Sequence, residues 1–129
     1  MKRRTAREKA LQALFQIDVS DILPNEAIEH ALNGKSADEF MNRIVYGTVE
    51  HKQELDELIS PNLVNWTIDR LAHIDRVILR MSVYELKYEN DIPAHVTLDE
   101  AIELAKIFGD DHSSKFINAV LENVNKALS

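Results

Sequence analysis

The sequence predicts an all-α protein of six or seven helices. Glycine and proline, the residues that tight turns need, number only three each in 129 residues. Leucine, alanine, glutamate and lysine, which favour helix, are plentiful. Between the few breaks, apolar residues recur every three or four positions, as on the buried face of a helix. A chain of this length is expected to form one domain, residues 1–129, with a hydrophobic core of its own.

The first two helices are predicted by their end signals and their apolar faces. Thr5 and Glu8 have the spacing of a capping box, with Thr5 as the N-cap. The apolar face that follows contains Leu11, Leu14, Phe15 and Ile17. Pro24 favours the start of a short second helix, and Asn33-Gly34 favours its end.

A long third helix and a central helix follow. The third is predicted from about Asp38 to Ile59, where Ser60-Pro61-Asn62 breaks the pattern. After a turn around residues 66–71, "HIDRVILRMSVYELKYE" is apolar nearly all round, which is typical of a central helix. A strand is the alternative because β-branched residues are frequent, but about 16 residues without a turn exceed the usual strand.

The last two helices are also delimited by their end signals. Thr97 and Glu100 predict a second capping box, and Gly109 the end of that helix. The final helix is expected from about Ser113 to Leu128.

The charge is unevenly distributed. Residues 2–9 carry a net charge of +4 in a chain of −7, so the remainder carries −11. An acidic body repels nucleic acid, but charges beyond about 10 Å are largely screened. A basic end can therefore still bind a polyanion locally.

The sequence gives little support for catalysis, a metal or a cofactor. There is no cysteine, and the three glycines are too far apart to form a phosphate-binding loop. His51 and Glu54 could share a helix face, but two ligands do not make a metal site. Neither a signal peptide nor a membrane-spanning run is found, so a cytoplasmic protein is expected.

Two positions are candidates for nucleic-acid binding. Arg3, Arg4 and Arg7 lie around the start of the first helix, where free backbone N–H groups also favour a phosphate. The alternative is a frayed, solvated tail. Phe116, beside Lys115, lies at the edge of the last helix's apolar stripe, where its ring could stack on an unpaired base. The alternative is that Phe116 only covers the rim of the core.

The central helix carries further cations. Arg76, Arg80 and Lys87 follow one side of it, with acidic residues nearby. We interpret them as a solvated ion-pair face rather than a binding site.

Three segments of the chain resemble the NusB family of bacterial transcription antitermination factors. They are "TAREKALQALFQID", "ILRMSVYELKYENDIP" and "LDEAIELAKIFGDDHSSKFINAVL", of which the last is the most specific. They occur in the family's order, and the resemblance covers the whole chain. It implies an all-helical fold of two small helical bundles packed together.

The resemblance also implies a function without catalysis. Family members bind boxA, a single-stranded element in the RNA of ribosomal operons, together with the ribosomal protein NusE. The heterodimer joins NusA, NusG and RNA polymerase and suppresses premature termination. Arg3, Arg4, Arg7, Lys115 and Phe116 match the family's RNA surface.

Other implications of the resemblance are less specific. Asp75, in "HIDR", matches a position near the RNA and NusE surface. The N-terminal basic run is shorter than in some members, and Ala119 and Leu98-Asp99 depart from the common pattern. A homodimer that covers the NusE-binding face in the free state is an open alternative.

Two other functions remain as alternatives. A similar helical domain precedes the catalytic part of some ribosomal RNA cytosine methyltransferases, but this chain has neither room for that part nor a cysteine nucleophile. A protein adapter without RNA binding would leave the arginines as a flexible tail.

Overall fold

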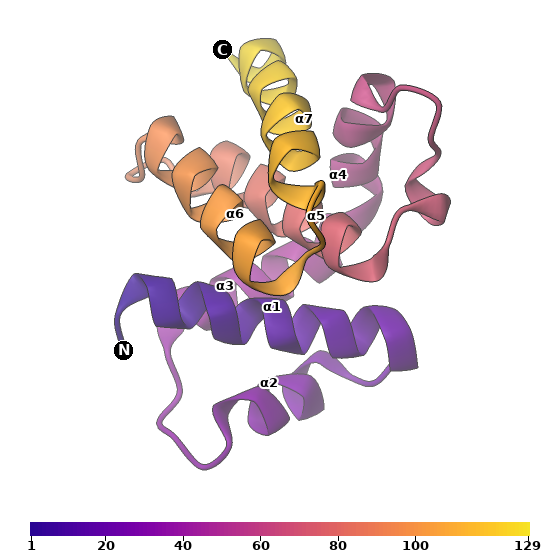
Figure 1. Ribbon diagram of the computed structural model, residues 1–129. Coiled ribbons are helices and arrows are strands. Elements are labelled where there is room, and N and C mark those ends of the chain that lie inside the picture. Colours follow the sequence, from indigo (N-terminus) through magenta and orange to yellow (C-terminus); the bar gives the residue numbers. More distant parts are fainter.

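The computed structural model describes residues 1–129, and its regular elements are all helical (Figure 1). The elements are α1 (Arg3–Ser20), α2 (Pro24–Leu32), α3 (Glu39–Glu50), α4 (Lys52–Ile59), the 3₁₀ turns η1 (Ser60–Asn62) and η2 (Ile68–Arg70), α5 (His73–Tyr88), α6 (Ala94–Phe108) and α7 (Ser113–Leu128). This confirms the predicted all-α class. No helix combines the length and the hydropathy that a membrane span requires.

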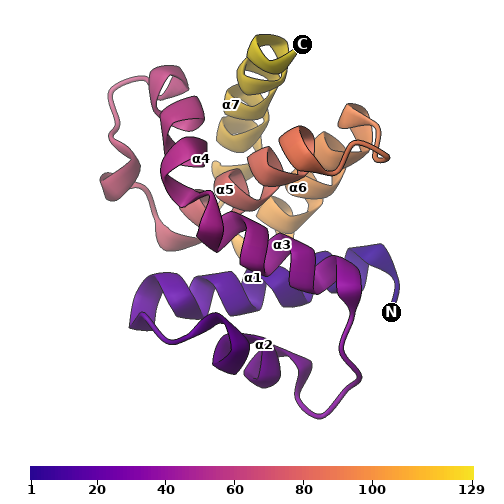
Figure 2. The same cartoon turned by 180° about the vertical axis from the view of Figure 1, so that it is seen from behind.

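The helices form two packed groups. α1 contacts α2 and α3 in one group, whereas α5 contacts α4, α6 and α7 in the other. Seen from behind, α3 lies across α1 and leads directly into α4 (Figure 2). Because α1 and α3 also pack on α5, the central helix predicted from the sequence joins the two groups.

One hydrophobic core runs through both groups. A single cluster of buried apolar side chains includes Leu11 and Ile44 from the first group and Ile78 and Leu121 from the second. The apolar core is therefore continuous across the two groups of helices.

The predicted capping box of α1 is wrong. The helix begins at Arg3, and Lys2 is the N-cap without a side-chain cap. Thr5 lies within the first turn, which closes through a hydrogen bond from the Ala6 N–H to the Lys2 carbonyl. Arg3 and Arg4 are therefore helical residues rather than residues of a preceding tail.

The predicted capping box of α6 is also wrong. α6 begins at Ala94, directly after Pro93, so Thr97 lies inside the helix. The buried Thr97 hydroxyl donates to Glu85 Oε1 at 2.9 Å. The Thr97 hydroxyl, which the sequence pattern had assigned to a helix cap, is therefore hydrogen-bonded to the Glu85 carboxylate of α5.

The predicted long helix from Asp38 to Ile59 is two helices. The first of them, α3, begins close to the predicted start. Asp38 is its N-cap, and the Asp38 side chain accepts a hydrogen bond from the Met41 N–H. His51, with φ −100° and ψ 15°, separates α3 from α4. The chain bends there so that both halves can pack on α5.

The cations of α5 form ion pairs, as predicted, but two of them are not on a solvated face. Arg76 and Arg80 are buried and share the carboxylate of Asp18 on α1. Arg80 also pairs with Asp56 on α4, at 2.7 Å. These pairs connect the two groups of helices.

Candidate nucleic-acid interface

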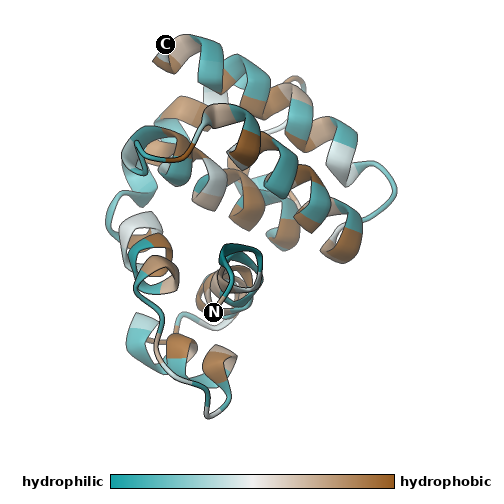
Figure 3. Ribbon diagram, turned by 90° about the vertical axis from the view of Figure 1, so that its left-hand side faces the viewer, coloured by the Kyte–Doolittle hydropathy of each residue, from teal (hydrophilic) through white to brown (hydrophobic).

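The start of α1 presents two exposed arginines. The side chains of Arg3 and Arg4 are 47% and 61% exposed. Arg3 lies 3.5 Å from Asp91, and Arg4 donates to Glu100 at 3.1 and 3.3 Å. Exposed ion pairs of this kind are weak, so a phosphate can replace the carboxylate at little cost. Figure 3 views α1 nearly end-on and shows the hydrophilic character of its first turn.

A lysine far along the chain extends this basic end. Lys35, between α2 and α3, borders the same hollow of about 350 Å³ as Lys2. Sequence analysis missed Lys35 because no local pattern marks it. Only the packing of the loop between α2 and α3 beside the start of α1 brings the two lysines together.

Arg7 has a different environment from Arg3 and Arg4. It is 4% exposed, and its guanidinium donates to both carboxylate oxygens of Glu85, with Nε at 3.2 and 3.1 Å. Breaking such a buried pair by removing one partner is strongly unfavourable. In this conformation Arg7 therefore joins α1 to α5 and does not face solvent.

The start of α7 presents the second predicted position. Lys115 is exposed, and the partly buried Phe116 packs against the core. Phe116 also borders a hollow of about 330 Å³ together with Asp75. The structure thus brings together Asp75 and Phe116, which the sequence analysis had named separately.

Asp75 is electrostatically unfavourable where it lies. Burial raises the pKa of its carboxyl group above the ordinary value, with Asp110 adding to this and the Ser113 hydroxyl opposing it. Its Oδ1 is buried and has no hydrogen-bond partner. Perturbed carboxylates with unsatisfied oxygens are concentrated at functional sites.

The arginines lie at one end of α1, and the start of α7 lies near the other end. Arg3 and Arg4 are at its first turn, whereas Phe15, near its other end, borders a hollow with Ser113 at the start of α7. Phe15 follows Arg3 by twelve positions along the helix, which corresponds to about 18 Å. A ligand that contacts both must therefore be extended, as a single nucleic-acid strand is.

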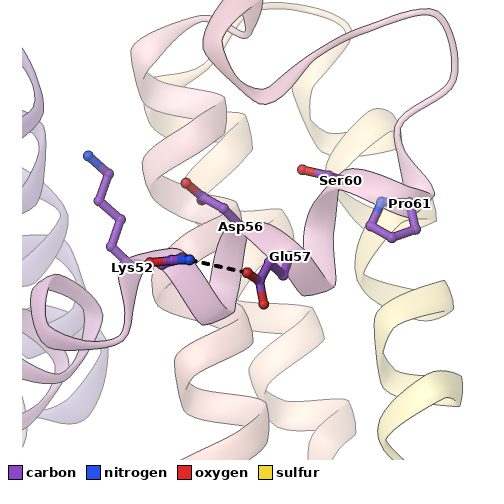
Figure 4. A pocket seen from close by; sticks show the side chains of 6 residues that line it. Lys52, Asp56, Glu57, Ser60 and Pro61 are labelled. Carbon is purple, nitrogen blue, oxygen red and sulfur yellow. Dashed lines mark hydrogen bonds between the residues drawn. The ribbon is translucent and has the colours of Figure 1, made fainter.

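Another hollow, beside α4, contains neither aromatic nor arginine side chains. Its volume is about 520 Å³, and Figure 4 shows its polar lining, with Gln53 donating to Glu57 at 3.4 Å. None of the predicted site residues borders it. Across residues 1–129, no group of three His, Cys, Asp or Glu side chains is placed to hold a metal ion.

Comparison with known protein families shows to which family this chain belongs. The family model described as "NusB family" matches residues 4–126. The chain belongs to the NusB family. This confirms the resemblance, and the family is one of transcription antitermination factors rather than enzymes.

Named relatives cover nearly the whole chain. Transcription antitermination protein NusB of Bacillus velezensis is 66% identical over 124 residues, covering 96% of this chain and 95% of that protein. NusB of Bacillus subtilis is 62% identical over 128 residues, covering 99% of this chain and 98% of that protein.

Solved structures share the fold. NusB of T. maritima superposes with a TM-score of 0.90 at 37% identity, covering 98% of this chain and 92% of that one. A structure described as antitermination factors NusB and NusE in complex with dsRNA has a TM-score of 0.87 at 29% identity, covering 97% of this chain and 96% of that one. That NusB, which shares this fold, has been solved together with NusE and double-stranded RNA.

Proposed function

We propose that this protein is a transcription antitermination factor that binds boxA RNA of ribosomal operons together with NusE. In this proposal the pair joins NusA, NusG and RNA polymerase in the cytoplasm. The observation that carries the proposal is the similarity to named antitermination proteins over 96% or more of the chain. The structure of NusB and NusE with RNA supports both kinds of partner.

The charge distribution supports a localised RNA contact. Arg3 and Arg4 are exposed at one end of a molecule whose net charge is −7. The acidic remainder disfavours indiscriminate binding to RNA and complements a basic ribosomal protein. Binding should therefore depend on the particular RNA and on NusE.

The structure suggests different roles for the predicted residues. We assign phosphate contacts to Arg3, Arg4 and Lys115, whose side chains are exposed, and a base contact to Phe116. Arg7 becomes a supporting residue in this proposal, because Glu85 already binds its guanidinium.

The test is fluorescence anisotropy of a labelled single-stranded boxA RNA titrated with the protein, alone and with NusE. A scrambled RNA of the same composition and a double-stranded boxA RNA are the controls. We expect the tightest binding to single-stranded boxA RNA, strengthened by NusE. Equal, weak binding to all three RNAs, unchanged by NusE, would contradict the proposal.

A further inference from the structure

The only Asn-Gly pair in the chain lies in the turn that follows α2. After Leu32, Asn33 and Gly34 are both in the left-handed conformation, with φ of 49° and 85°. The Lys35 N–H donates to the Leu32 carbonyl oxygen at 3.0 Å, which closes the turn. Two successive positive φ angles are typical of a type I′ turn, for which Asn-Gly is a preferred sequence. The turn therefore accounts for the pair, and it also sets the surroundings in which the pair can react.

These surroundings leave the side-chain amide of Asn33 open to attack by the next backbone nitrogen. Asn33 and Gly34 are both exposed, and a Cβ atom at position 34 would meet no heavy atom within 4 Å. The N–H groups of Asn33 and Lys35 donate to backbone carbonyl oxygens, whereas that of Gly34 donates no hydrogen bond. Glycine has no side chain that would hinder a reaction at its nitrogen. The Gly34 nitrogen is therefore both unhindered and free of a hydrogen bond.

We propose that Asn33-Gly34 is a site of spontaneous deamidation, which places a negative charge beside the basic end of the molecule. The deprotonated Gly34 nitrogen attacks the side-chain amide carbon of Asn33 and forms a bond to it. The bond from that carbon to the amide nitrogen breaks, and the leaving group takes a proton from solvent and departs as ammonia. Water then opens the resulting succinimide at either carbonyl carbon and gives aspartate or isoaspartate. The net reaction exchanges ammonia for water, so it needs neither an oxidant nor a reductant.

The attack requires a local opening of the turn. Asn33 has ψ of 50° in the closed turn, and rotation about this angle must bring its side-chain carbon onto the Gly34 nitrogen. That rotation breaks the hydrogen bond from Lys35 to Leu32. Exposed turns open at a much smaller free-energy cost than the whole domain. We therefore expect the reaction in the folded protein, at a lower rate than in a short peptide of the same sequence.

The new charge lies close enough to act on the basic end. Lys35 follows Asn33 by two positions, so their Cα atoms are at most about 7 Å apart. Exposed charges interact over about 8–10 Å at physiological salt. Lys35 borders a hollow with Lys2, and Figures 1 and 2 show the segment between α2 and α3 beside this end of α1. Deamidation should therefore weaken the attraction of an RNA phosphate, a consequence that rests on the proposed function.

The first test follows the side-chain amides of the unmodified protein without RNA. The protein is incubated in mildly alkaline buffer, digested at acidic pH at intervals and analysed by mass spectrometry, while circular dichroism confirms that it stays folded. We expect loss of the amide at Asn33, with aspartate and isoaspartate products separated by chromatography. Asn65 is the internal control, because it is also exposed, with φ of 64°, but is followed by the bulky Trp66.

Two results of this test would overturn the proposal. One is loss of the Asn33 amide no faster than that of Asn65. The other is loss at Asn33 only after the protein has been unfolded in urea, which would show that the closed turn protects the pair.

The second test measures the consequence for RNA binding. Asn33→Asp reproduces the aspartate product and should weaken binding to boxA RNA roughly 1.5- to 5-fold, the factor that corresponds to one exposed charge interaction. The difference should shrink at high salt. Asn33→Gln keeps a neutral amide and is the matched control, which should bind as the unmodified protein does.

The outcomes separate the modification from the proposed function. If Asn33→Asp binds boxA RNA as tightly as Asn33→Gln, the predicted effect on RNA binding is wrong. If none of the three proteins binds boxA RNA, the proposed function itself fails, and the effect on RNA binding fails with it. The deamidation is decided by the first test in either case, because that test contains no RNA.

Discussion

Two arginines one helical turn apart on α1 have opposite environments. Both Arg3 and Arg7 lie over the ring of Phe40, at 4.5 and 5.2 Å from its centroid. Arg3 is exposed, whereas Arg7 lies one turn further into the molecule, where Glu85 of α5 binds it. The sequence marked both as cations at a helix start, but it could not show that a residue 78 positions away neutralises the second.

The same reasoning explains which site residues could be predicted. Phe116 was found from its place at the edge of an apolar stripe, and Asp75 only through the resemblance to the family. Lys35 became a candidate only because the fold brings it beside the start of α1. Proximity between distant segments carries no local signal.

At the scale of the residue, the burial of the Asp75 carboxyl group predicts that stability depends on pH. Burial raises the pKa of its carboxyl group in the folded protein, so ionisation at neutral pH destabilises the fold. Asp75→Asn should therefore raise the free energy of unfolding at about pH 7. The gain should shrink as the pH falls through the raised folded pKa toward the ordinary value of about 3.9.

Urea unfolding of both proteins at a series of pH values measures this difference. Asp99→Asn, at an exposed position of α6, is the control and should show no comparable gain. A loss of stability at neutral pH in Asp75→Asn would mean that the carboxylate makes a stabilising contact in the free protein.

At the scale of the helix, end signals were less reliable than apolar periodicity. α2 and α7 lie close to where the sequence placed them, because their breaks are fixed by backbone preferences such as the left-handed conformation of Asn33. The capping boxes at Thr5 and Thr97 failed because both helices begin further upstream, α1 at Arg3 and α6 at Ala94, directly after Pro93. The break at His51 carries no proline or glycine, so the sequence did not reveal it.

At the scale of the helix, Gly47 in α3 allows this helix to pack closely against α5. A Cβ atom at position 47 would overlap the ring of Tyr84 on α5. Gly47→Ala should therefore lower the free energy of unfolding by about 1–3 kcal/mol through overpacking, although alanine favours helix by about 1 kcal/mol.

Thermal or urea unfolding of a double-mutant cycle checks the cause. Tyr84→Leu removes the ring, so in that background Gly47→Ala should no longer destabilise the protein. Stabilisation by Gly47→Ala in the unmodified background would show that the close approach of α3 and α5 is not required.

At the scale of the whole molecule, the fold combines an acidic body with a basic end. The core and the ionic contacts of Asp18, Arg76 and Arg80 hold the two groups of helices together. They fix the start of α1 relative to the start of α7, so the exposed cations and the hollow beside Phe116 keep a constant separation. An extended RNA strand with a phosphate contact at one place and a base contact at the other fits this arrangement.

The salt dependence of boxA RNA binding tests the central claim most directly. With Arg3, Arg4 and Lys115 each neutralising one phosphate, the slope of log affinity against log salt concentration should be roughly −2 for single-stranded RNA. The Arg3→Ala/Arg4→Ala double variant should reduce the slope to roughly −0.7. A slope near zero in the unmodified protein, or one unaffected by the double variant, would contradict the assignment of the start of α1 as the RNA-binding end.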